Sequence, residues 1–93
     1  MANIYTNNIT GTDDIIPFGP RSKKYKYKLW LQSGSSPVQI NVYSDDGQSY
    51  TLDEATTLQK SVSGVLYGYG IRLVVGLGST GHYNIVEFDN FND

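Results

Sequence analysis

Apolar and polar residues alternate along most of this chain, which is the pattern of β-strands with one buried face. Residues 24–31 place a tyrosine or leucine at every second position, with lysines and one tryptophan between them. Residues 38–43 alternate in the same way with valine and isoleucine, and residues 49–52 form a third short run. The Asp-Asp-Gly sequence at residues 45–47 predicts a tight turn, because glycine tolerates a positive φ.

The second half of the chain has the same period of two. Residues 71–77 and 82–88 predict two further strands, joined as a hairpin by the glycine-rich segment 78–81. Glycines interrupt the alternation of residues 61–69, which indicates a bent or bulged strand. One more strand is expected at residues 4–9. The chain therefore divides into six to eight short strands with little helix.

Short strands at regular spacing predict an all-β domain, either a small antiparallel sandwich or a barrel, and we expect the β-sandwich. A chain of 93 residues with 39% hydrophobic residues has enough apolar side chains for one core. We therefore expect a single domain over residues 1–93. Residues 1–22 form an N-terminal strand and arm, and residues 23–93 form the body of the sandwich.

The composition excludes several kinds of chemistry. There is no cysteine and only one histidine, His82, which excludes a disulfide scaffold, a thiol nucleophile and a Cys/His zinc site. The formal net charge of −2 argues against nucleic acid as a partner. No segment is long and apolar enough for a membrane helix, and no signal peptide is visible. We expect a soluble protein, either cytoplasmic or secreted by a non-classical route.

Pairing the first two strands as a hairpin predicts a surface suited to sugars. The outer face of that hairpin carries Trp30, Tyr43, Gln39, Asn41 and Lys28. Sugars present C–H patches that pack on aromatic rings, and hydroxyls that pair with amides and ammonium groups. We therefore predict a carbohydrate-binding site at these residues. The alternative is that the tryptophan packs under a neighbouring loop while the lysines protect an edge strand.

The last two runs, paired in the same way, predict a second surface. Arg72 then lies opposite Glu87, while Val86 and Phe88 point into the core. This pairing also leaves an apolar strip on the outer face, made of Val74, Tyr83 and Ile85. Either the N-terminal strand or a second subunit must cover such a strip. Because a small domain gains stability from a partner, we expect a homo-oligomer, dimer or higher.

Candidate catalytic and metal-binding groups are few. Neighbouring carboxylates such as Asp45 and Asp46 serve a turn and do not face each other as an acid–base pair. Whether calcium binds there stays open, since the EF-hand pattern is absent. The sequence singles out no serine or threonine as a catalytic partner for His82. Residues 21–28 are rich in lysine and tyrosine, as in surfaces that bind single-stranded nucleic acid. In a strand the lysines and the tyrosines lie on opposite faces, so the rings cannot stack on bases that the lysines attract. We predict no enzymatic activity, no metal and no cofactor.

Several short motifs occur in the order and approximate spacing of a known family. They are Lys23-Lys24-Tyr25 with Tyr27, Gly47-Gln48, the run 71–75, Thr80-Gly81, and Tyr83, Ile85, Glu87 and Phe88. In these motifs residues 23–88 resemble the fungal immunomodulatory proteins, which are lectin-like β-sandwiches. The resemblance implies an immunoglobulin-like sandwich, glycan binding, no enzymatic activity and a dimer. The chain departs from that family in lacking its N-terminal helical segment, and Phe88 stands where the family has tryptophan.

Two functions follow from these observations. The first is a non-enzymatic, lectin-like protein that binds glycans or glycoproteins and gains avidity as a homo-oligomer. The second is a structural or interaction protein, such as a viral or phage decoration protein, that assembles through β-edge contacts. The saccharide, the size of the oligomer and the physiological role are not specified by the sequence.

Overall fold

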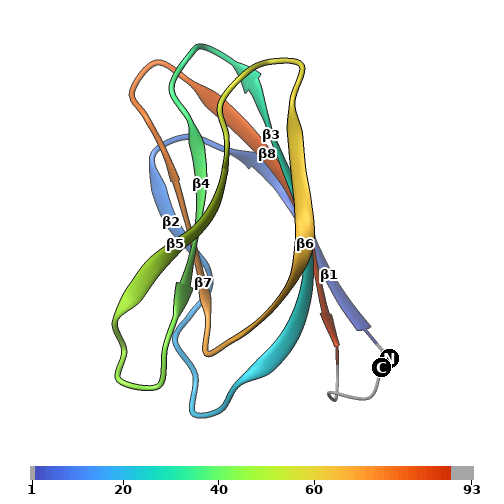
Figure 1. Ribbon diagram of the computed structural model, residues 1–93, viewed down its shortest axis with the longest axis vertical. Helices are drawn as coiled ribbons and strands as arrows, with labels where there is room; N and C mark the ends of the chain where they lie inside the picture. Colours follow the sequence, from blue (N-terminus) through green and yellow to red (C-terminus); the bar gives the residue numbers. More distant parts are fainter. Residues whose placement is uncertain (1, 89–93) are drawn as a thin grey trace.

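The computed structural model describes residues 2–88 and shows two antiparallel four-stranded sheets packed face to face (Figure 1). The strands are β1 (Ala2–Ile9), β2 (Thr12–Ile16), β3 (Lys23–Ser33), β4 (Val38–Tyr43), β5 (Ser49–Ala55), β6 (Ser61–Gly68), β7 (Ile71–Val75) and β8 (Thr80–Phe88). The predicted small antiparallel β-sandwich is confirmed, with eight strands. Within the described residues there is no helix, so none could cross a membrane.

The strand order is that of a jelly roll. Sheet A has the order β1-β8-β3-β6 and sheet B the order β2-β7-β4-β5. The chain crosses from one sheet to the other at every connection except the turn between β4 and β5. Two interleaved Greek keys of this kind define the jelly roll, whereas immunoglobulin domains have a different strand order. The resemblance implied an immunoglobulin-like sandwich, and this part of the prediction is wrong, because the strands follow the jelly-roll order.

Alternation within the strands builds the core between the two sheets. In β3 the buried side chains are Tyr25, Tyr27, Leu29 and Leu31, and the residues between them face outward. In β4, Val38, Ile40 and Val42 are likewise buried. These are the residues that the period-two pattern assigns to the core.

The predicted turn at residues 45–47 is present and joins β4 to β5 as a hairpin. Gly47 has a φ of 84°, and its amide donates to the carbonyl of Ser44 at 3.0 Å. The carboxylate of Asp46 accepts hydrogen bonds from the Gln48 amide at 3.0 Å and from the Ser44 hydroxyl at 2.9 Å. Both hydrogen bonds lower the pKa of Asp46, and that to the backbone is the stronger cause. The acidic residues of this turn therefore serve its geometry.

The two other predicted hairpins are wrong. β3 pairs with β6 and β8, while β4 lies in sheet B between β5 and β7. β7 and β8 are also in different sheets. Consequently Arg72 does not face Glu87: Arg72 pairs with Asp14 at 2.8 Å, and Glu87 with Lys23 at 3.5 Å. The loops that look like hairpin turns in the sequence instead carry the chain across the sandwich.

The prediction of which face of β8 is buried is also wrong. Tyr83 and Ile85 lie in the core, with exposed fractions of 9% and 0%, whereas Val86 and Phe88 are half-buried on the outer face of sheet A. The predicted apolar strip therefore does not exist, and β1 pairs along the edge of β8 instead of covering it. Of that strip only Val74 faces outward, half-buried on sheet B.

Candidate functional site

The five residues of the predicted carbohydrate site lie on opposite sides of the sandwich. Lys28 and Trp30 are on the outer face of sheet A, because the alternating residues of β3 point into the core. Gln39, Asn41 and Tyr43 are on the outer face of sheet B for the same reason. The core separates the two groups, so no single ligand of sugar size contacts all five. The predicted site is therefore not assembled as one surface.

Tyr43 is buried and belongs to a structural cluster. Its hydroxyl donates to Asp14 Oδ1 at 2.8 Å, and Arg72 Nε donates to the same oxygen at 2.8 Å. The guanidinium lies over the Tyr43 ring, 5.5 Å from its centroid, and Phe18 packs edge-on at 5.9 Å. The hydrogen bond from Arg72 lowers the pKa of Asp14, while burial and then Asp14 raise the pKa of Tyr43. These contacts join β2, β4 and β7 and leave Tyr43 buried at 7% exposure.

The two amides of β4 are engaged in the sheet or buried. Gln39 Nε2 donates to Glu54 Oε2 on β5 at 3.3 Å. The side-chain oxygen of Asn41 is buried and has no hydrogen-bond partner within residues 2–88. Neither amide is placed beside an exposed aromatic ring of β3, which is the arrangement the sugar-binding prediction required.

Trp30 forms a composite aromatic group with His82 on the outer face of sheet A. The two rings stack with centroids 4.4 Å apart, since the residues are opposite each other on β3 and β8. Lys28 Nζ lies 5.7 Å from the Trp30 centroid. The imidazole nitrogens contact the Thr6 hydroxyl at 3.3 Å and the Asn8 side-chain oxygen, both on β1. Neutral groups therefore hold the histidine in place, and the histidine supports the indole.

Two adjacent hollows flank the indole and share Trp30 and Lys28. The larger, about 480 Å³, is lined by Lys26, Tyr27, Lys28, Trp30, Ser63, Asn84 and Val86. The smaller, about 260 Å³, is lined by Lys28, Trp30, Leu58, Gln59, Lys60 and Ser61. We call these two hollows together the Trp30 groove. Its lining offers ammonium groups, amides, serine hydroxyls and an indole, and among the described residues no carboxylate lines it.

Most residues of the Trp30 groove were missed by the sequence prediction. Asn84 comes from β8, and Ser61 and Ser63 come from β6, which are both distant from β3 along the chain. Their polar, outward positions in alternating strands are visible in the sequence. The pairing that brings them beside β3 is not, because alternation carries no information on which strand is the neighbour.

Glu87 is a buried carboxylate on the inner face of sheet A, near the end of β8. It is 7% exposed and accepts hydrogen bonds from Tyr25 and from Asn3 Nδ2 at 3.3 Å. Lys23 Nζ lies 3.5 Å from the same carboxylate. Burial, and then Glu87, raise the pKa of Tyr25 and of Tyr5. The carboxylate is thus paired and hydrogen-bonded, as a buried charge must be for the fold to tolerate it.

Within residues 2–88 no group of three or more histidine or acidic side chains is placed to hold a metal ion. Asp45 and Asp46 were the candidate calcium ligands. Within residues 2–88 no third acidic or histidine side chain lies close enough to them to form such a group. The arrangement that the described residues build is a binding surface with charged, polar and aromatic groups.

Comparison with known proteins shows similarity of fold alone. No family model matches the sequence, and no curated protein matches it. Among solved structures, the chain is similar to a protein of the Bacillus endospore appendages, which are described as forming a novel family of disulfide-linked pili. The TM-score is 0.53 with 15% sequence identity, over 94% of this chain and 88% of that one. The likeness therefore extends over nearly the whole sandwich.

Proposed function

We propose that this protein is a structural subunit that assembles with copies of itself through the free edges of sheet A. The observation that carries the proposal is the character of the two edge strands, β1 and β6. Each has eight residues, no proline and no charged side chain. Each also pairs with its neighbour without a register shift. Long, regular, uncharged edges are templates for pairing with another chain, and soluble proteins ordinarily block them.

The edges of sheet B show the contrast. β2 has only five residues, contains Asp13 and Asp14, and is bulged after them. β5 carries Asp53 and Glu54 and is also interrupted by a register shift. Shortness, charge and bulges are the usual means of protecting an edge. Within the described strands the chain thus protects both edges of sheet B and leaves both edges of sheet A without a paired neighbour.

The direction of the strands favours an open chain of subunits. All pairings in sheet A are antiparallel, so β1 runs opposite to β6. The β6 of one copy can therefore pair with the β1 of a next copy in the same antiparallel pattern, and the contact repeats without closing. Four strands at about 4.8 Å each give a repeat of about 19 Å per subunit. A twist of roughly 20–25° per strand rotates each subunit by about 80–100°.

The similar solved structure supports the proposal, since it comes from appendages that form pili. Those pili are disulfide-linked, whereas this chain has no cysteine. Contacts between copies would therefore be held by backbone hydrogen bonds and side-chain packing. Exposed apolar side chains on β6, Val65 at 52% and Tyr67 at 55%, supply apolar surface next to its free edge.

A charge placed on the edge of β6 tests the proposal. We expect the wild-type chain to form particles larger than a monomer in sedimentation velocity, with a fibre repeat of about 19 Å by electron microscopy. The Val65→Lys variant places an ammonium group on the open edge and is expected to sediment as a folded monomer. The matched control is Leu52→Lys, which adds the same charge to an exposed position on β5, the protected edge.

Equal loss of assembly in both variants would attribute the effect to net charge and contradict pairing through sheet A. A wild-type chain that sediments as a monomer at all concentrations would also contradict the proposal. Circular dichroism of both variants verifies that the sandwich is intact.

A further inference from the structure

We propose that the Trp30 groove binds an acidic polysaccharide chain, one whose sugar units carry carboxylate or sulfate groups. The groove belongs to a single subunit, so this binding does not depend on assembly. It places an anionic sugar ligand on the outer face of sheet A, away from the residues of sheet B.

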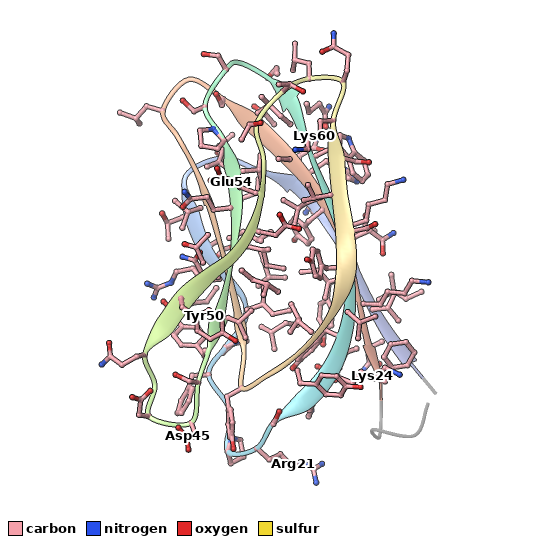
Figure 2. All side chains as sticks on the ribbon, in the orientation of Figure 1. Arg21, Lys24, Asp45, Tyr50, Glu54 and Lys60 are labelled. Carbon is pink, nitrogen blue, oxygen red and sulfur yellow. The ribbon has the colours of Figure 1, made fainter. Side chains whose placement is uncertain are left out.

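The lysines of β3 give the outer face of sheet A a basic character. The outer face of sheet A carries Lys24, Lys26 and Lys28 and, within residues 2–88, no carboxylate. The outer face of sheet B carries Asp14 and Glu54 together with Arg72, which pairs with Asp14 at 2.8 Å. In Figure 2 Lys24 projects from the side of sheet A, whereas Glu54 and the turn residue Asp45 lie on the side of sheet B. A chain with a net charge of −2 thus presents one face that attracts anions.

The cations of the groove lie where a chain-like ligand can meet them in succession. Lys26 and Lys28 are two residues apart on β3 and point to the same side, which separates them by about 7 Å along the strand. Lys60, the residue just before β6, lines the smaller hollow. A ligand lying across the strands from Asn84 to Gln59 therefore passes all three ammonium groups.

The remaining groups in the groove suit sugar units. Trp30 offers an aromatic surface for the C–H face of a pyranose ring, and its stacking with His82 fixes its position. The amides of Asn84 and Gln59 and the hydroxyls of Ser61 and Ser63 can donate to or accept from sugar hydroxyls. Two of the five residues predicted for carbohydrate binding, Trp30 and Lys28, thus stay together in a different site.

A nucleic acid fits the groove less well. Single-strand binding uses several aromatic rings on which successive bases stack, whereas this groove has one indole, already stacked on an imidazole. The hydroxyl and amide groups outnumber the rings, which favours a ligand rich in hydroxyls.

The binding test uses the single tryptophan as its probe. Trp30 is the only tryptophan in the chain, so its fluorescence reports directly on the groove. The wild-type protein is titrated with oligogalacturonate, with a heparin-derived oligosaccharide, with neutral dextran oligosaccharide and with an oligo-dT of similar length. We expect a saturable change with at least one of the two acidic sugars, weakened by added salt, and none with dextran.

Variants that each replace a lysine by an uncharged glutamine locate the site. Lys28→Gln is expected to weaken binding about fivefold, and Lys26→Gln with Lys28→Gln together by more, as for ion pairs near a surface. The matched control is Arg21→Gln, which removes one positive charge at the opposite end of the molecule from Lys60 (Figure 2) and is expected to leave the affinity unchanged. These side chains are exposed, so the variants keep the fold.

Four outcomes would overturn the proposal. The first is equal weakening by Arg21→Gln and Lys28→Gln, which would mean general charge attraction. The second is tighter binding of oligo-dT than of either acidic sugar, which would make the face a nucleic-acid platform. The third is equal binding of dextran, which would mean that the acidic groups are irrelevant. The last is no change with any of the four probes, in fluorescence or in calorimetry.

Discussion

Leu29 and Trp30 are neighbours on β3, yet substitution by alanine is expected to have very different costs. Leu29 is 0% exposed in the core, and removing its side chain there costs about 3 kcal/mol of unfolding free energy. Trp30 is half-buried on the outer face, where its removal mainly loses the stacking with His82, about 1 kcal/mol. For a domain of this size each kcal/mol lowers Tm by about 4–8 °C. Leu29→Ala should therefore lower Tm by about 12–24 °C, and Trp30→Ala by about 4–8 °C.

Thermal unfolding followed by far-UV circular dichroism measures both variants without relying on tryptophan fluorescence. The comparison tests which face of β3 is buried, because a shift of register by one residue exchanges the two side chains. A larger cost for Trp30→Ala than for Leu29→Ala would refute the assignment of faces, and with it the Trp30 groove.

Three further changes have defined outcomes. Tyr43→Phe removes the hydroxyl that donates to Asp14 and should cost about 1 kcal/mol in denaturant unfolding. Because Asp14 has a lowered pKa in the folded state, its contribution is present above about pH 4 and is lost as the pH falls below that. The advantage of wild type over Asp14→Asn, under about 1 kcal/mol for so exposed a pair, should therefore shrink in acid. Gly34→Ala should destabilise more than Gly47→Ala: both have positive φ, but only at Gly34 does a Cβ clash with Ser79.

The buried face of most strands could be predicted from the sequence, because it follows from alternation alone. β3 and β4 have apolar residues at every second position and polar residues between them, so only one face can enter the core. In β8 apolar residues occur on both faces, and the prediction chose the wrong one. Ile85 is in the core, whereas Val86 contributes to the Trp30 groove.

The pairing of strands could not be predicted in the same way. The sequence favours pairing of consecutive strands through short loops, and among the described strands only β4 and β5, joined by the turn at residues 45–47, do this. The other connections cross between sheets, which alternation does not signal. The predicted carbohydrate site depended on one such pairing, so Trp30 and Lys28 were separated from Gln39, Asn41 and Tyr43 when β3 and β4 entered different sheets.

Assembly of copies through β1 and β6 can be followed strand by strand with amide hydrogen exchange at rising protein concentration. Edge strands have backbone amides that exchange readily when they face solvent. We predict that amides of β1 (Ala2–Ile9) and β6 (Ser61–Gly68) become protected as the protein assembles, while those of β2 and β5 do not change. Assembly accompanied by protection of β2 and β5, or with no new protection of β1 and β6, would contradict the account.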